Sequence, residues 1–316
     1  MENLNLNKEM FAPLSNEEKR VDAVVRPSVG YWGDAWRRLK SNKVALVSLI
    51  ILALVMLLVG VLTTFPSLYP HTYDATNLAM ANQGPSAQHI FGTDDLGRDL
   101  FIRVIYGAKY SLVIAFVAAF INLIIGVVYG SVAGFFGGVV DNIMMRVVDI
   151  LYSIPTIIYV VLIAALMYDP EAKSSGMFSI ILALSISYWI NMARIVRSEV
   201  LQLKQQEFVL AATALGASKV RILFKHLLPN CLGSIIVTLT LLIPQAIFTE
   251  AFLSFIGLGI NPPLASLGTL ANSAMRTIYT YEYQLLFPAL AICVIILGFN
   301  LFGDGLTEAL DPKNRR

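Results

Sequence analysis

The sequence predicts an all-helical polytopic membrane protein with six transmembrane helices, and three observations lead to this prediction. First, 57% of the 316 residues are hydrophobic, only 14% are charged, and the mean hydropathy is +0.69; a soluble domain usually has about 25% charged residues. Second, six long stretches contain no Asp, Glu, Lys or Arg. Third, the apolar residues in these stretches are continuous instead of alternating, which favours membrane helices over a barrel.

Each charge-free stretch can hold one helix of about 20 apolar residues, the length that crosses the hydrocarbon core. In chain order these stretches are 44–73, 110–140, 150–168, 174–193, 226–249 and 283–303. Each stretch accounts for most of one expected helix, and we expect these helices over residues 44–65, 110–133, 147–168, 177–195, 231–256 and 285–303. The residues before 44 are polar, so the first helix is expected to be a permanent span and not part of a cleaved signal peptide.

Positive charge is distributed unevenly between the two sides of such a protein. Eighteen of the 23 Lys and Arg residues lie on the side of the N-terminus, so the positive-inside rule makes that side cytoplasmic. The expected organisation is a cytoplasmic N-terminal segment, a first helix, an extracytoplasmic loop, a core of five helices that contains a cytoplasmic loop, and a cytoplasmic tail. These parts are residues 1–43, 44–65, 66–109, 110–303 with the loop at 196–230, and 304–316.

Several kinds of site are not expected. The net charge of +2 gives no reason to expect nucleic acid as a partner, and Cys231 and Cys293 both lie in apolar runs, which excludes a disulfide scaffold. The three histidines, His71, His89 and His226, have no partner at the sequence spacing of metal ligands, so we assign no metal, cofactor-binding or catalytic residue. The acidic residues around Arg98 are expected to form a solvated or salt-bridged loop.

The loop at 196–230 predicts two short amphipathic helices. In the first, Phe208, Ala211, Ala212 and Leu215 recur at helical spacing, and Gly216 is a typical helix stop. The second repeats the spacing. Its apolar positions are Val220, Leu223, Phe224 and Leu227, Ser218 is its expected cap, and Leu228 and Pro229 follow it, the proline ending the helix before the fifth span. Such helices either fit a groove on a partner protein or lie on lipid headgroups, and the spacing alone does not decide between the two.

This loop resembles the "EAA" loop of binding-protein-dependent ABC importer permeases. The family pattern is Glu-Ala-Ala, three residues, Gly, nine residues, Ile, one residue, Leu-Pro, and Ala211, Ala212, Gly216, Leu228 and Pro229 match it. Two positions depart from the pattern: Leu210 stands at the Glu position and His226 at the Ile position.

Other segments extend the resemblance from Trp36 to Pro312 and are similar to the "C"-type subunit of oligopeptide, dipeptide and nickel permeases. They are the segment from Phe91 to Asp99, the one from Ala133 to Gly138 with Arg146 and Asp149, and those from Leu253 to Gly259, Phe299 to Gly305 and Leu310 to Pro312. The resemblance implies a type I ABC importer permease fold in a bacterial cytoplasmic membrane, with both termini in the cytoplasm.

The resemblance also implies partners. They are a homologous "B"-type permease, two cytoplasmic ATPase subunits and an extracytoplasmic substrate-binding protein, all acting at the lipid bilayer. ATP is used by the ATPase subunits, and the sequence contains no Gly-Lys dipeptide of a phosphate-binding loop. The loop at 207–228 would then couple the ATPases to half of a pathway for oligopeptides or dipeptides. Nickel chelates and glutathione remain open as cargo, as does the alternative of a secondary transporter or channel that acts without ATPases.

Two features inside the expected spans have both a structural and a functional reading. Glu250 is an acidic residue deep in the fifth span, where it either contacts the pathway or a neighbouring subunit, or locks helices together through hydrogen bonds. Gly126, Gly130 and Gly134 form a stripe of small residues on the second span, which favours close packing of another helix.

Overall fold

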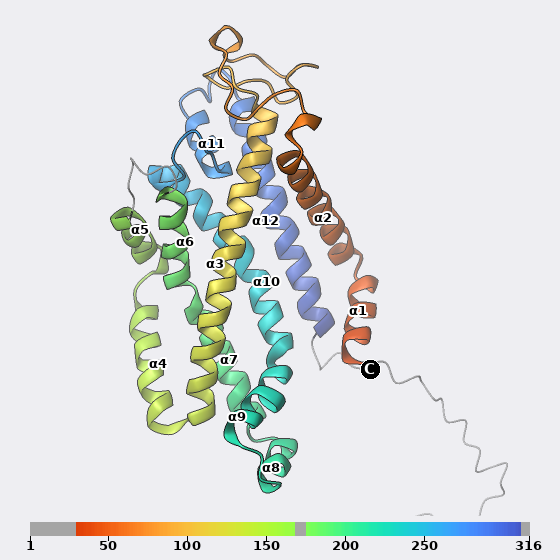
Figure 1. Cartoon of the computed structure of the whole chain (residues 1–316), viewed down its shortest axis with the longest axis vertical. Coiled ribbons are helices and arrows are strands. Elements are labelled where there is room, and N and C mark those ends of the chain that lie inside the picture. The colour runs from red at the N-terminus through yellow and green to blue at the C-terminus, as the bar shows by residue number, and fades with distance from the viewer. Residues whose placement is uncertain (1–29, 168–174, 311–316) are drawn as a thin grey trace, which may run out of the picture.

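The structure is a computed structural model that describes residues 30–167 and 175–310. Every secondary-structure element in these ranges is a helix, apart from one isolated β-bridge between Thr93 and Asp99 (Figure 1). The long helices run roughly parallel to the long axis of the molecule. The helices are α1 (Tyr31–Ser41), α2 (Lys43–Thr64), α3 (Leu100–Phe136), α4 (Gly138–Ser153), α5 (Thr156–Met167), α6 (Ser175–Ser187), α7 (Trp189–Leu203), α8 (Glu207–Ala214), α9 (Lys219–Arg221), the π-helical turn η4 (Ile222–Leu227), α10 (Leu228–Leu253), the π-helical turn η5 (Ser254–Leu258), α11 (Leu267–Ala274) and α12 (Tyr283–Leu310).

Within the described residues, five helical segments are long and apolar enough to cross a membrane, and a bent pair of helices gives a sixth crossing if it counts as one span. The five are Lys43–Thr64, Leu100–Phe136, Gly176–Leu203, Lys219–Leu258 and Tyr283–Leu310. Each overlaps one of the expected spans. The structure does not describe residues 1–29, 168–174 and 311–316. Large parts of the expected N-terminal segment and of the expected C-terminal tail therefore lie outside the described residues.

The third expected span is not one straight helix, and the prediction of a continuous helix over 147–168 was wrong. Helix α4 begins earlier, at Gly138, and α5 follows it at an angle of 84°. The break falls at Ile154, which has an extended backbone (φ −93°, ψ 129°), and at Pro155 after it. A residue before proline is disfavoured in the helical conformation, and proline itself cannot donate the helical hydrogen bond, so the bend follows from the local sequence.

Several helices extend beyond the expected spans because a charged residue marks the edge of the membrane and not the end of a helix. Helix α3 begins at Leu100 instead of residue 110 and contains Arg103, which is buried and lies 3.4 Å from the carboxylate of Asp94. Its first turn is capped by Asp99, whose Oδ1 accepts a hydrogen bond from the backbone N–H of Ile102 (2.9 Å). Helix α7 likewise continues to Leu203 and α12 to Leu310.

Two further helices were not expected. The charged segment before the first span folds into α1, where Ala35 and Leu39 are buried and Asp34 pairs with Arg37 and Arg38. Helix α11 lies between the fifth and sixth expected spans and begins with a capping box, in which Ser266 and Thr269 exchange side-chain hydrogen bonds with each other's backbone. In Figure 1, α8 lies at one end of the bundle and the loop 65–99 and α11 lie at the other, while α1 lies beside the end of α12 that is nearer to α8.

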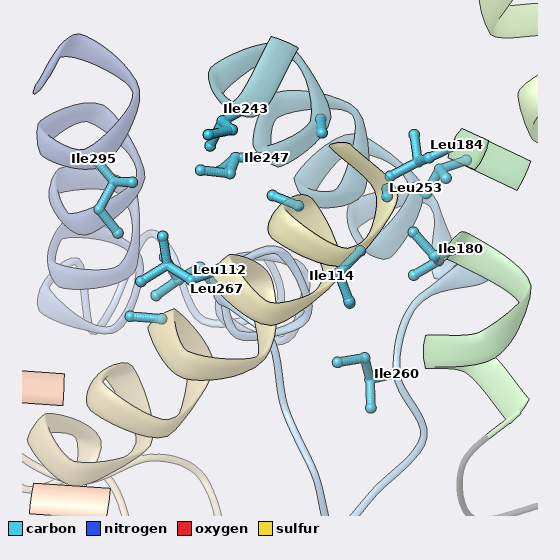
Figure 2. Packing of buried hydrophobic residues seen from close by; sticks show 14 of the residues in the cluster. Leu112, Ile114, Ile180, Leu184, Ile243, Ile247, Leu253, Ile260, Leu267 and Ile295 are labelled. Carbon is cyan, nitrogen blue, oxygen red and sulfur yellow. The ribbon is translucent and has the colours of Figure 1, made fainter. Parts of the chain in front are cut away.

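The core is formed where α3, α6, α10 and α11 meet. Figure 2 shows Ile114 of α3 near Leu184 and Ile180 of α6 and Leu253 of α10, while Leu112 and Leu267 lie toward Ile295 of α12. These side chains are fully or almost fully buried. Helix α3 is therefore the central element around which the other long helices pack.

The glycine stripe of α3 packs against α7, as the sequence predicts. A Cβ atom added at Gly130 would lie 2.3 Å from the backbone oxygen of Ala193 and 3.0 Å from the backbone nitrogen of Arg197. Gly126 and Gly134 also approach α7 closely, since an added Cβ atom would lie 2.5 Å from Met192 Cβ and 2.8 Å from the backbone oxygen of Arg197. Helix α4 is attached to α7 by a paired contact in which Arg197 donates to both carboxylate oxygens of Asp141 (2.5 and 2.6 Å).

We expect the substitution Gly130→Ala to destabilise the protein by about 1–3 kcal/mol, because the added methyl group meets backbone atoms that cannot rotate away. The measurement is the thermal unfolding midpoint in detergent. Gly60→Ala on α2 is the matched control, since nothing lies within 4 Å of a Cβ atom there. Equal midpoints for the two variants would contradict the close α3–α7 packing.

Candidate functional site

The hairpin of α8, α9 and η4 projects from one end of the molecule, beyond the ends of α3 and α4 (Figure 1). It connects α7 to α10. The second arm does not end at Pro229, contrary to expectation, because one helical segment continues from Lys219 to Leu258. Pro229 lies in the first turn of α10, directly after the π-helical turn η4. Proline cannot donate the helical hydrogen bond, so Pro229 interrupts the hydrogen bonding of this segment at the point where the π-helical turn meets α10.

The turn of the hairpin forms as the sequence predicts. Helix α8 stops at Gly216, which has a positive φ of 78°, a conformation that favours glycine. The backbone N–H of Ala217 donates to the carbonyl of Ala212 (3.0 Å), a bond typical of a helix that ends in a left-handed residue. The expected cap of the second arm is also present, since Ser218 Oγ accepts from the backbone N–H of Arg221 (3.3 Å).

The inner face of the hairpin is anchored to the bundle. Val209 from α8 and Ile222 and Leu227 from η4 are buried, and they join one apolar cluster with residues of α7 and α10. The other buried members of this cluster are Met192, Val196, Val200, Cys231 and Ile235. The hairpin is therefore packed onto α7 and α10 as one body and is not a loosely attached loop.

The outer face of the hairpin is apolar and uncovered. Leu215 is 88% exposed, and Phe208, Leu210, Val220 and Phe224 are also exposed. Ala211 lies on the same exposed face, Ala212 and Leu228 are half-buried, and Pro229 is exposed. We call the exposed set Phe208, Leu210, Ala211, Leu215, Val220 and Phe224 the hairpin surface.

The sequence prediction for this hairpin was right for three of the four positions of the first arm, since Ala212 is half-buried, and partly wrong for the second arm. Phe208, Ala211 and Leu215 do share an exposed face. In the second arm, Leu227 is buried while Val220 and Phe224 are exposed, and Ile222, which the helical spacing excluded, points into the bundle. The π-helical turn explains the difference, because it has more residues per turn than the α-helix whose spacing was assumed.

The second candidate site is the buried carboxylate of Glu250, which has no exposed surface. Ser111 Oγ of α3 donates to Glu250 Oε2 (2.7 Å), and Ser254 Oγ of η5 donates to Oε1 (2.7 Å). Ser266 Oγ donates to Ser254 Oγ (3.1 Å), and the N–H of Leu267 donates to Ser111 Oγ (3.3 Å). Glu250 thus joins α3, α10 and the first turn of α11 through hydroxyl groups, an arrangement that favours a structural role.

The loop 65–99 contains a third group of polar residues. Arg98 Nε pairs with Asp94 Oδ2 (2.7 Å), so the expected salt-bridged loop is present. The structure also places His71, His89 and Asp99 together, although nothing in their sequence spacing indicated this. Tyr69 donates to the carboxylate of Asp99 (3.2 Å); burial and the neighbouring charge of Asp99 raise the pKa of this tyrosine, so it remains a donor.

Comparison with protein families gives two matches. Residues 126–316 match the model described as a binding-protein-dependent transport system inner membrane component. Residues 30–85 match the model of the N-terminal TM domain of oligopeptide transport permease C. The two together cover most of the chain, including α1, the hairpin and Glu250.

Individual relatives match over nearly their whole length. The oligopeptide transport system permease protein OppC of Bacillus subtilis (strain 168) is 48% identical over 312 residues, 99% of each chain. The dipeptide transport system permease protein DppC of the same organism is 48% identical over 98% of this chain and 94% of that protein. OppC of Escherichia coli (strain K12) is 41% identical over 98% of this chain and 99% of that protein.

Solved structures show the same fold at lower identity. An inward-facing structure of the MetNI methionine ABC transporter superposes with a TM-score of 0.53, is 20% identical, and covers 67% of this chain and 98% of that chain. A second inward-facing form of that transporter has a TM-score of 0.51. The family matches and the near full-length relatives establish that the chain belongs to the binding-protein-dependent transport system inner membrane components, among the permease proteins related to OppC and DppC.

Proposed function

We propose that this chain is the permease subunit of an ATP-driven importer of oligopeptides or dipeptides, and that it forms half of the translocation pathway. Its partners are a homologous "B"-type permease, two cytoplasmic ATPase subunits and an extracytoplasmic substrate-binding protein. The single observation that carries the proposal is the uncovered apolar hairpin surface on a hairpin that is itself packed onto two membrane helices. The peptide cargo is taken from the names of the relatives OppC and DppC.

The hairpin is proposed to be the coupling element. A short helix with exposed apolar side chains and small residues such as Ala211 can enter a groove on an ATPase subunit. Because Val209, Ile222 and Leu227 are buried against α7 and α10, a push on the hairpin moves both helices as a unit.

The motion has a defined path to the far end of the molecule. Helix α10 runs from the hairpin to Glu250, and Glu250 is hydrogen-bonded to Ser111 of α3 and, through Ser254, to Ser266 before α11. A displacement of α10 therefore reaches α11 at the other end of the bundle. Rigid-body motion of such packed helices around a fixed path is the general mechanism of alternating access.

The proposed orientation places the hairpin and α1 in the cytoplasm and the loop 65–99 with α11 outside, in a bacterial cytoplasmic membrane. The charge asymmetry of the sequence supports this orientation, and α1 lies on the side of the molecule from which α8 projects, which is consistent with it. Both termini are then cytoplasmic. We propose that the chain itself binds no cofactor and that ATP is bound by the partner ATPases.

Photo-crosslinking tests the coupling role. A benzoylphenylalanine in place of Leu215, the most exposed residue of the hairpin surface, is expected to crosslink to an ATPase subunit in membranes that contain the whole transporter. The matched control is the same probe in place of Leu57, which is exposed on α2 and faces lipid in this arrangement. Crosslinks from residue 215 to phospholipid alone would contradict the proposal and favour a hairpin that lies on headgroups.

A further inference from the structure

His71 and His89 form a stacked pair beside a buried carboxylate in the loop 65–99. Their ring centroids are 4.5 Å apart at an interplanar angle of 29°. One ligating atom from each of His71, His89 and Asp99 lies within 4.8 Å of the other two, and in the described part of the chain this is the single group of three such residues. His89 and Asp99 are buried and His71 is half-buried.

Each imidazole has one nitrogen held by an oxygen acceptor. His89 Nδ1 lies 2.8 Å from Asp99 Oδ2, and His71 Nε2 lies 3.0 Å from the backbone oxygen of Gln88. A backbone carbonyl and an ionised carboxylate only accept hydrogen bonds, so both of these nitrogens are the donors. The other nitrogens, His89 Nε2 and His71 Nδ1, then carry free lone pairs in the neutral rings.

This pattern is typical of histidines that bind metal ions. In metal sites, the nitrogen that does not bind the metal usually donates to a carboxylate or to a backbone carbonyl, which fixes the tautomer and the orientation of the ring. The two acceptors here, Asp99 and the carbonyl of Gln88, are one of each kind. Asp99 is itself held in place, because it caps α3 through Ile102 and accepts from the hydroxyl of Tyr69.

A purely structural role explains only part of the arrangement. The hydrogen bond from His89 to Asp99 would fasten the loop to the start of α3 without any ion. It gives no reason, however, for a second imidazole to stack on the first with its own donor satisfied and its other nitrogen free. Two nearby imidazoles without a thiolate suit Zn²⁺, Ni²⁺ or Cu²⁺, while Ca²⁺ and Mg²⁺ prefer oxygen ligands.

We propose that His71 and His89 bind a divalent first-row transition metal ion, with Asp99 as the positioning residue that orients His89. Water completes the coordination, and the free nitrogens His71 Nδ1 and His89 Nε2 bind the ion. The bound ion joins residue 71, early in the loop, to residue 89, and the hydrogen bond from His89 to Asp99 attaches this pair to the start of α3. This inference does not depend on the function proposed for the hairpin.

Zinc titration of the intact protein tests the proposal. The full chain, purified in detergent and freed of metal with a chelator, is titrated with Zn²⁺ against a chromophoric competitor. We expect one high-affinity equivalent per chain, and a loss of affinity of tenfold or more in His71→Gln and in His89→Gln. His226→Gln is the matched control, since His226 lies on the hairpin at the opposite end of the molecule, and it should bind zinc as the unmodified protein does.

His71→Gln is the decisive variant because it leaves the hydrogen bond between His89 and Asp99 in place. Zinc should raise the thermal unfolding midpoint of the unmodified protein and of His226→Gln but not that of His71→Gln. The proposal is overturned if His71→Gln binds zinc as tightly as the unmodified protein, or if all three histidine variants lose affinity equally. A loss of stability in His89→Gln with unchanged zinc binding in His71→Gln would establish the purely structural role instead.

Discussion

Replacing Ala211 and Leu215 together by Asp is expected to abolish ATP-dependent uptake while the protein still folds and inserts. Both residues lie on the exposed hairpin surface, where substitutions usually change the free energy of unfolding by no more than about 0.5 kcal/mol. If the hairpin surface is buried in a groove on an ATPase subunit, the same substitutions lower the binding free energy by much more than this. Burial of a leucine side chain contributes about 1.5–3 kcal/mol, and each unpaired carboxylate adds a desolvation cost.

The expected loss of ATPase affinity in this double variant is on the order of a hundredfold or more, since 1.4 kcal/mol corresponds to a factor of ten. The measurements are uptake of a labelled peptide by cells and retention of the ATPase subunits on the purified permease. The double variant Gln205→Asp, Gln206→Asp is the control, because it adds the same two negative charges to exposed residues just before α8. Normal uptake by the double variant at normal expression would refute the coupling role of the hairpin.

Replacing Glu250 by Ala is expected to lower the free energy of unfolding by about 3–5 kcal/mol. The substitution removes the acceptor for the hydroxyls of Ser111 and Ser254, and a buried polar group without a partner costs about 1–3 kcal/mol. The volume left empty adds a further cost. Glu250→Gln keeps the volume and one acceptor oxygen, so we expect it to remain folded and to transport within about threefold of the unmodified protein, a difference of about 0.6 kcal/mol.

A double-mutant cycle distinguishes the two roles of Glu250. If the residue locks α3 to α10, Ser111→Ala and Glu250→Ala will destabilise the protein non-additively, because they remove the same hydrogen bond. The readout is the unfolding midpoint in detergent together with peptide uptake. A Glu250→Gln variant of full stability that no longer transports would contradict the structural role and assign Glu250 to the pathway.

The order of the membrane crossings and the positions of five of the six could be predicted from the sequence, but the lengths of the helices could not. Charge-free stretches indicate which residues lie in the hydrocarbon core of the membrane. Helix α3 nevertheless starts ten residues before its expected first residue, because Arg103 is buried against Asp94 instead of facing water. The bend between α4 and α5 could have been found, since Pro155 stands inside the apolar run. The hydropathy of the run alone does not indicate this bend.

The candidate sites differ in how far the sequence indicates them. Gly216 and Ser218 determine the turn of the hairpin locally, so its existence could be predicted. Which side chains face outward in its second arm depends on a π-helical turn, which no residue pattern signalled. The contact between His71 and His89 depends on tertiary structure, because the fold of the loop 65–99 brings the two rings together. The spacing of the two residues in the sequence does not indicate this contact.

Reconstitution in liposomes tests the central claim, that this chain works only as part of an ATP-driven assembly. The chain is reconstituted with its partner permease, with or without the two ATPase subunits, and uptake of a labelled peptide is measured with the substrate-binding protein outside and ATP inside. We expect uptake only when both ATPase subunits and ATP are present, and none with the Ala211→Asp, Leu215→Asp variant. Peptide uptake by the chain alone, driven by an ion gradient or by the peptide gradient, would contradict the account.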